Sequence, residues 1–172
     1  GKRYPGGVRD CKRDHSKRKG KRKAKTYYRG IKQAMRQITL TLQEISVLSE
    51  QIVKDFSDGV IILRGDLAAG KTTLTKSIVS SLGLRDEVTS PTFSLQQNYS
   101  DRVFHYDIYN KGLEHFISLG LLEELEKEGL HIVEWGDDKL REILVDAGFD
   151  LLEITIDKVA DDKRKYIIRE YN

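Results

Sequence analysis

The feature that most constrains this chain is the loop at residues 65–72, which reads Gly-Asp-Leu-Ala-Ala-Gly-Lys-Thr. It matches the phosphate-binding pattern G-x-x-x-x-G-K-[ST] in full, and it lies between the apolar run at residues 60–63 and a helical pattern. Such a loop works only between a strand and a helix, because its amide groups and the positive end of the helix must face one anion. The loop therefore predicts an α/β fold.

Individual positions of the loop have distinct roles in holding a nucleotide. Gly65 and Gly70 permit backbone angles that direct successive N–H groups at phosphate oxygens. Lys71 would reach the outer phosphates, and the Thr72 hydroxyl would bind Mg²⁺. We expect contacts to ATP from Gly65, Ala68, Ala69, Gly70, Lys71, Thr72 and Thr73. The simpler alternative is a glycine-containing turn without a ligand, and the Lys-Thr pair with correct flanks argues against it.

Strand-like and helix-like patterns alternate along the chain from residue 35. Predicted strands lie at residues 38–42, 60–63, 93–99, 103–107, 130–133, 151–156 and 166–169. Predicted helices lie at about residues 45–56, 74–82, 113–127 and 138–145. This alternation is typical of a mostly parallel sheet flanked by helices. We therefore expect one P-loop NTPase domain over residues 35–172.

The beginning of the chain differs sharply in charge from the rest. Residues 1–36 carry 15 Lys or Arg and two Asp, whereas residues 37–172 carry 15 Lys or Arg and 25 Asp or Glu. Runs such as residues 17–25 have too little apolar surface to offset the chain entropy lost on folding. We therefore expect a disordered basic leader over residues 1–34.

Two origins are open for this leader. The only methionine, Met35, directly precedes the first strand pattern, which favours a leader that is foreign to the native protein. The alternative is a native arm that binds RNA through its charge, with Tyr27 and Tyr28 as stacking platforms. A foreign leader would bind polyanions, if at all, without sequence preference, whereas a tRNA-specific interaction would indicate a native arm.

Composition argues against membrane, disulfide and zinc proteins. The longest purely apolar runs have about four residues, far short of the roughly 20 needed to cross a bilayer. The single cysteine, Cys11, cannot form an internal disulfide, and no Cys/His spacing matches a zinc site. We expect a protein of the reducing cytoplasm.

A candidate metal ligand follows the apolar strand at residues 130–133. In P-loop proteins an acid at the end of a neighbouring strand organises the metal ion, so Glu134 is the candidate Walker B acid. Together with Thr72 it would bind Mg²⁺. Acids often follow strands, and it is the upstream loop that favours the metal role here. His131 lies within the strand, where packing is the expected role.

Four short motifs, in this order, resemble the bacterial TsaE family. They are the loop at residues 65–73, Ser-Pro-Thr-Phe at residues 90–93, His-Tyr-Asp-Ile-Tyr at residues 105–109 and Glu-Trp-Gly-Asp at residues 134–137. Each motif is unspecific alone, but together they are highly specific. The resemblance covers about residues 37–170.

The resemblance implies a protein that binds and hydrolyses ATP with Mg²⁺. It implies TsaD and TsaB as partner proteins in threonylcarbamoyladenosine modification of tRNA, with tRNA contacted indirectly through that complex. By the same resemblance, Thr92 would contact the γ-phosphate from a switch-like loop, and Asp107 would orient the water or the metal. Glu134 would be the Walker B acid, and Trp135 would pack beside the site.

Two positions depart from the family pattern. Asn110 stands where the family often has arginine, and Ile45 stands where a threonine near the nucleotide is usual. These departures concern contacts on the adenine side, not the phosphate chemistry. Simpler roles also remain open, since Pro91 can mark an ordinary turn and Trp135 can serve packing alone.

Other P-loop functions have weaker support. A small-molecule kinase usually brings an arginine-rich lid over the phosphates, yet Arg102 is the only arginine between Thr92 and Glu134. A GTPase needs an N-K-x-D element, and residues 110–113 fail at its last position. A nucleotide-gated binding module with negligible turnover differs from an ATPase only in rate, which a sequence does not report.

Overall fold

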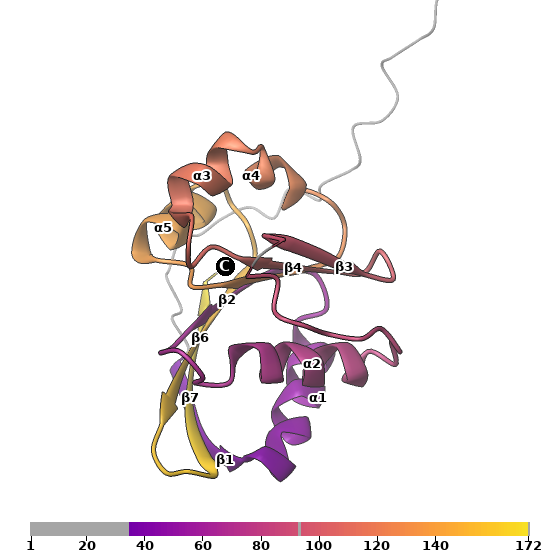
Figure 1. The fold of residues 1–172 in the computed structure, drawn as a ribbon, viewed down its shortest axis with the longest axis vertical. Coiled ribbons are helices and arrows are strands. Elements are labelled where there is room, and N and C mark those ends of the chain that lie inside the picture. The colour runs from indigo at the N-terminus through magenta and orange to yellow at the C-terminus, as the bar shows by residue number, and fades with distance from the viewer. Residues whose placement is uncertain (1–34, 93, 172) are drawn as a thin grey trace, which may run out of the picture. The chain divides into compact units, whose positions relative to one another are not determined.

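The computed structural model describes residues 35–92 and 94–171, so the predicted leader, Phe93 and Asn172 lie outside the described residues. Within these residues seven strands form one sheet in the order β1-β7-β6-β2-β5-β4-β3 (Figure 1). The strands are β1 Met35–Thr41, β2 Gly59–Arg64, β3 Gln96–Tyr99, β4 Val103–Asp107, β5 Leu130–Glu134, β6 Leu151–Lys158 and β7 Lys163–Tyr171. The helices are the 3-10 helix η1 Leu42–Glu44, and α1 Ile45–Asp55, α2 Lys71–Ser81, α3 Gly112–Ser118, α4 Leu121–Glu124 and α5 Asp138–Asp146.

Parallel strands occupy the middle of the sheet. β2 pairs in parallel with β5 on one side and with β6 on the other, and β4 pairs in parallel with β5. The apolar residues 60–63 of β2 are buried, as expected for a central strand covered on both faces. β1, β7 and β3 are antiparallel to their neighbours. The predicted α/β sheet flanked by helices is confirmed, with antiparallel strands added at both edges.

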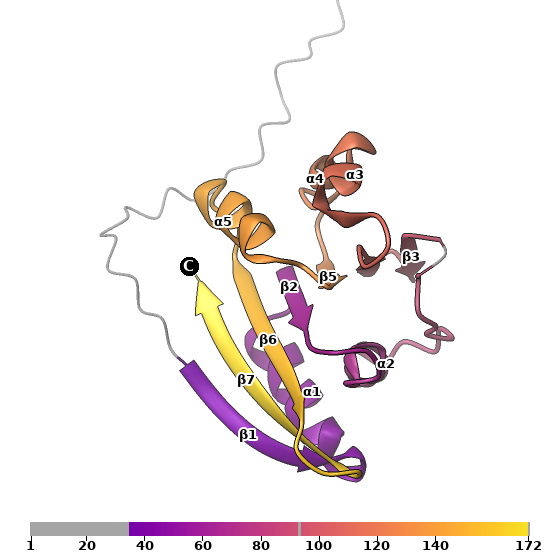
Figure 2. The same ribbon diagram turned by 60° about the vertical axis from the view of Figure 1, so that its left-hand side comes forward.

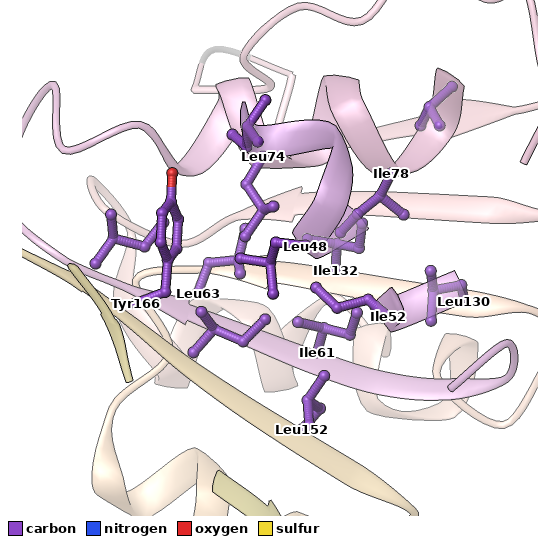
Figure 3. Packing of buried hydrophobic residues seen from close by; sticks show 14 of the residues in the cluster. Leu48, Ile52, Ile61, Leu63, Leu74, Ile78, Leu130, Ile132, Leu152 and Tyr166 are labelled. Atoms are coloured by element: carbon purple, nitrogen blue, oxygen red, sulfur yellow. The ribbon is translucent and has the colours of Figure 1, made fainter. Parts of the chain in front are cut away.

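Helices cover both faces of the sheet (Figures 1 and 2). α1 and α2 pack on one face, and α3, α4 and α5 pack on the other. On the α1/α2 face, Ile61 and Leu63 of β2 belong to one hydrophobic cluster with Leu74 of α2 (Figure 3). Val60 and Ile62 belong to the core on the opposite face, because successive side chains of a strand point to opposite sides. The alternation along β2 therefore joins two cores through one strand.

One predicted helix is wrong in its extent. Residues 113–127 do not form a continuous helix, because the helical conformation is interrupted between α3 and α4. Gly120 there adopts φ of 70°, a left-handed angle that an α-helix cannot contain and that glycine tolerates. The apolar periodicity runs through this break, so the pattern alone predicts one helix.

Two predicted strands are too long. Leu42 was expected in the first strand, but it begins η1 and its side chain is exposed. The strand ends at Thr41, whose backbone N–H and hydroxyl both donate to the Glu44 carboxylate at 2.8 Å and start the helical turn. The strand expected from residue 93 begins only at Gln96, because Leu95 adopts φ of 65°.

The helices are short. Among residues 35–92 and 94–171, the two longest helices, α1 and α2, have 11 residues each. In the part of the chain that the structure describes, no helix has the length and apolar character needed to cross a membrane.

Candidate functional site

The glycine-rich loop connects the end of β2 to the start of α2 (Figure 2). Gly65 and Gly70 adopt φ of 143° and 113°, and Ala68 between them adopts 59°. A Cβ added to Gly65 would lie 2.5 Å from the carbonyl oxygen of Ile156, so no larger residue fits there. Left-handed positions within a loop turn its backbone N–H groups toward one side, which is the arrangement that binds anions.

Lys71, the first residue of α2, folds back over this loop. Its Nζ donates to the carbonyl oxygens of Gly65 at 2.7 Å and Asp66 at 2.9 Å, and it lies 3.5 Å from the centroid of the Trp135 ring. Burial lowers the pKa of the Lys71 ammonium. Nearby carboxylates act in the opposite direction, and Glu134 has the largest effect among them. A phosphate oxygen would be a stronger, charge-assisted partner for this cation than two neutral carbonyls. Lys71 is therefore well suited to bind an anion at the loop.

Glu134 lies at the end of β5, the strand next to β2. Its side chain is buried, and its Oε1 accepts a hydrogen bond from the Thr72 hydroxyl at 2.8 Å. The same oxygen lies 2.9 Å from Nε2 of His105. The two predicted metal ligands are thus in direct contact. Their hydroxyl and carboxylate oxygens are the hard ligands that Mg²⁺ prefers, so the residues present fit this ion.

Asp107 ends β4 and pairs with Glu134 in the register of the sheet. Its Oδ2 accepts hydrogen bonds from the Thr92 hydroxyl at 2.6 Å and the Ser90 hydroxyl at 3.5 Å, and its Oδ1 accepts from the backbone N–H of Tyr109 at 2.9 Å. The Ser-Pro-Thr loop is therefore held at the same edge of the sheet as the phosphate-binding loop. Two buried carboxylates from neighbouring strands face this edge.

Trp135 follows Glu134 and has an uncommon backbone conformation. Its φ is 68°, and its N–H donates to the carbonyl oxygen of Leu63 at 2.9 Å. Its ring contacts Lys71 and lies 4.4 Å, centroid to centroid, from the ring of Tyr109. A positive φ is rare for a bulky residue and persists only where the surroundings hold it in place. This constraint keeps the indole beside the loop.

A cavity of about 820 Å³ opens beside the loop. It is lined by the loop, by residues 135–137 and by the β6–β7 hairpin. Its volume lies in the range that holds small-molecule ligands. From β7, Arg164 donates through Nε to the carbonyl oxygen of Ala69 at 2.9 Å and so connects the hairpin to the loop.

Most of the residues proposed from the sequence meet at one edge of the sheet. The loop, Asp107, Glu134 and Trp135 all lie at the ends of β2, β4 and β5, where ligands bind in open parallel sheets. Thr73 differs from them, because it is exposed on the first turn of α2.

Sequence reasoning missed His105 and Tyr99. His105 contacts Glu134 through Nε2, and its Nδ1 lies 3.2 Å from the hydroxyl of Tyr99. One signal was present in the sequence, because His105 and Asp107 are two positions apart in one strand and so share a face. The missing information was the pairing of β4 with β5, which no local pattern gives.

Comparison with known proteins finds a matching family and several relatives. Residues 32–166 match the family described as "Threonylcarbamoyl adenosine biosynthesis protein TsaE". A protein of Bacillus subtilis (strain 168), named tRNA threonylcarbamoyladenosine biosynthesis protein TsaE, is 37% identical over 113 residues, covering 59% of this chain and 71% of that protein. A protein of the same name from Treponema pallidum (strain Nichols) is 41% identical over 81 residues, covering 45% of this chain and 60% of that protein. The match to the Treponema protein thus spans less than two thirds of its length.

A solved structure has a similar fold. The crystal structure of YdiB from Bacillus subtilis aligns with a TM-score of 0.61 and 28% sequence identity. The alignment covers 83% of this chain and 88% of that chain. The similarity therefore extends over the sheet and the helices that surround the loop.

Proposed function

Because this chain belongs to the TsaE family of threonylcarbamoyl adenosine biosynthesis proteins, we propose that it supports threonylcarbamoyladenosine modification of tRNA through a Mg²⁺-dependent cycle of ATP binding and hydrolysis. One observation carries the chemical part of this proposal. The phosphate-binding loop, the Thr72–Glu134 pair and the Asp107–Thr92 pair meet at one edge of the sheet. These are the groups that phosphoryl transfer from a nucleotide requires.

ATP would bind with its phosphates against the loop. Backbone N–H groups of residues 65–72 and the N-terminal end of α2 would face the phosphate oxygens. Lys71 would exchange its carbonyl partners, Gly65 and Asp66, for oxygens of the outer phosphates. The cavity between Trp135 and the β6–β7 hairpin would hold the remainder of the nucleotide.

Hydrolysis would use the two buried acids in different roles. Thr72 and Glu134 would hold Mg²⁺, which when bound neutralises charge on the outer phosphates. Asp107 would orient the attacking water, and Thr92 would contact the γ-phosphate from the loop that Asp107 now holds. Attack of water on the γ-phosphorus would release ADP and phosphate. These residues supply position and charge, which are the main contributions that proteins make to this reaction.

The partners that we propose are TsaD and TsaB, with tRNA reached through them. Purified chain would be tested for Mg²⁺-dependent ATP hydrolysis, and for support of repeated tRNA modification by TsaD and TsaB. Lys71→Ala should lower both activities, because it weakens ATP binding. Lys76→Ala is the matched control, because Lys76 is exposed on the same helix. Modification that proceeds equally without this chain, or with Lys71→Ala in its place, would contradict the proposal.

A further inference from the structure

We propose that His105 is a positioning residue that fixes the orientation of Glu134, as the centre of a hydrogen-bonded series that runs from Thr89 to Thr72. This inference rests on the proposed function, because it takes Glu134 as the acid that organises the metal. It adds a role for a residue to which neither the loop motif nor the family's name assigns one.

The contacts at Glu134 carry the first step. Its Oε1 has two partners, the Thr72 hydroxyl at 2.8 Å and Nε2 of His105 at 2.9 Å. The carboxylate is 2% exposed, so water competes little with these partners. Thr72 belongs to the loop and would be drawn toward the metal when the nucleotide binds. His105 is then the partner that keeps the carboxylate in place.

The other side of the imidazole is held as well. The Tyr99 hydroxyl lies 3.2 Å from Nδ1 of His105 and 2.6 Å from Oε1 of Gln97, so it contacts both groups. His105 is fully buried. Burial of the Tyr99 hydroxyl raises its pKa to about 12, so the phenol keeps its proton. Because both ring nitrogens have partners, the ring orientation is defined. A partner held on both sides is what orients a metal-binding carboxylate precisely.

The series ends at the loop that carries the Ser-Pro-Thr motif. Nε2 of Gln97 donates to the Thr89 hydroxyl at 2.8 Å, and the Tyr99 hydroxyl lies 3.4 Å from the Thr89 carbonyl oxygen. The adjacent residue, Ser90, contacts Asp107 directly. One loop therefore contacts one acid directly and reaches the other through Tyr99 and His105. A shift of this loop would change the position of both acids together.

A second buried histidine provides a matched control. His131 lies on β5 and, like His105, is fully buried. Its ring stacks on Phe104 at 4.6 Å and bonds to the Tyr106 hydroxyl at 3.1 Å and the Lys127 carbonyl oxygen at 2.9 Å. Phe104 and Tyr106 belong to the core opposite the α1/α2 face. His131 therefore tests burial without contact to the acids.

The experiment compares three variants, His105→Gln, His105→Asn and His131→Gln. A glutamine amide nitrogen can occupy the position of Nε2 and donate to Glu134, whereas an asparagine amide reaches only the position of Nδ1. Single-turnover ATP hydrolysis, ATP affinity by calorimetry with Mg²⁺ and with EDTA, and thermal unfolding are measured for each. We expect His105→Asn to lower the hydrolysis rate by about 10- to 100-fold, as loss of a partner of a metal ligand does. It should also weaken the effect of Mg²⁺ on ATP affinity while leaving affinity in EDTA unchanged.

His105→Gln should recover most of the rate, and His131→Gln should lower the unfolding temperature with little effect on hydrolysis. Equal rates for His105→Gln and His105→Asn, or equal slowing by His131→Gln, would overturn the proposal while leaving the ATPase function intact. Failure of the proposed function is distinguishable, because the unaltered chain would then itself lack Mg²⁺-dependent hydrolysis, and both proposals would fall.

Discussion

Charged residues are buried in one region of the molecule and exposed to solvent in another. At the ends of β2, β4 and β5, the residues Lys71, Asp107 and Glu134 are all at most 5% exposed. On the wing formed by β1 and α1, the pair Arg36–Asp55 is 4.0 Å apart and its side chains are 56% and 46% exposed. Burying charge costs stability unless partners compensate for the lost water. Charges are therefore buried at the edge where a ligand is expected, and they remain in water on the wing.

The topology explains why the buried charges collect where they do. Parallel strands end at the same edge, so the residues that follow β2, β4 and β5 are neighbours although they are distant in sequence. The wing is antiparallel and offers no such edge. If the comparison is correct, substitutions at the edge should change function strongly, and substitutions on the wing should change almost nothing.

The largest effect is expected at Glu134. Glu134→Gln should reduce single-turnover ATP hydrolysis by about 10²- to 10³-fold, the usual loss when one preorganised group that stabilises transition-state charge is removed. ATP affinity in EDTA should be retained, because the loop is unaltered. Asp107→Ala should behave similarly. Glu142→Gln is the control, since that side chain is 70% exposed on α5. Normal hydrolysis by both edge variants would show that these acids do not serve the reaction.

The next effect is expected at Lys71. Lys71→Ala should weaken ATP binding by roughly 10- to 100-fold, because a charged hydrogen bond contributes about 1.5–3 kcal/mol. Calorimetry measures the affinity directly. Emission from Trp135, the only tryptophan, provides a second measurement, since Nζ of Lys71 lies 3.5 Å from its ring centroid.

Addition of Mg-ATP should change this emission in the unaltered chain and in Lys76→Ala. An ATP affinity unchanged by Lys71→Ala would remove the loop from the proposed site. Saturating ATP without any change in emission would remove Trp135 from it.

A smaller effect is expected at His131, which is buried but lies outside the proposed site, and it concerns the pH dependence of the free energy of unfolding. Burial lowers the pKa of His131 below its ordinary value of 6.5, although the Lys127 carbonyl acts in the opposite direction. Below pH 6.5 the unfolded chain then binds a proton that the folded chain does not. The free energy of unfolding should therefore fall as pH falls from 6.5 to the folded pKa, by at most about 1.4 kcal/mol per pH unit, and His131 contributes no such loss above this window.

Urea unfolding at a series of pH values measures this slope. His131→Gln should make the slope shallower, whereas His115→Gln, at a half-buried position on α3, is the control for loss of a histidine. An identical slope in the unaltered chain and in His131→Gln would show that burial of this ring carries no pH-dependent cost.

The smallest effect is expected on the wing. Arg36→Gln should change the free energy of unfolding by less than about 1 kcal/mol, since exposed ion pairs gain little over their interactions with water. ATP hydrolysis should be unaffected. Chemical denaturation in low and high salt measures the contribution. A large loss of stability or activity would break the contrast between the edge and the wing.

The parts of the fold with local signals were predictable from the sequence. The glycine-rich loop, the buried run of β2 and the alternation of strands and helices all follow from patterns within a few residues. The interruption of the helix at Gly120 was not predictable, because apolar periodicity continues across it and only the backbone angle of Gly120 ends the helix. The late start of β3 was missed for a similar reason, since Leu95 adopts a left-handed angle that its residue type does not indicate.

The candidate site could be proposed from the sequence as a set of residues but not as a set of contacts. The loop motif named Thr72, the acid after the strand at residues 130–133 named Glu134, and the resemblance to the TsaE family named Asp107. The contact of His105 with Glu134 depends on which strands are neighbours, and the position of Trp135 over Lys71 depends on a positive φ. Sequence patterns give neither the strand order nor an angle that a residue type normally avoids.

The hydrogen bond from Arg164 to Ala69 has a consequence for the order of events during synthesis. The two residues are 95 positions apart, so the loop leaves the ribosome long before Arg164, whose side chain donates to it. Contacts between residues so distant in sequence form late, because the intervening chain must first be ordered. A nascent or prematurely terminated chain that stops before β7 would carry the whole glycine-rich motif while one side of its loop remained unsupported. During synthesis of this chain, the glycine-rich motif is therefore present before the site that contains it is complete.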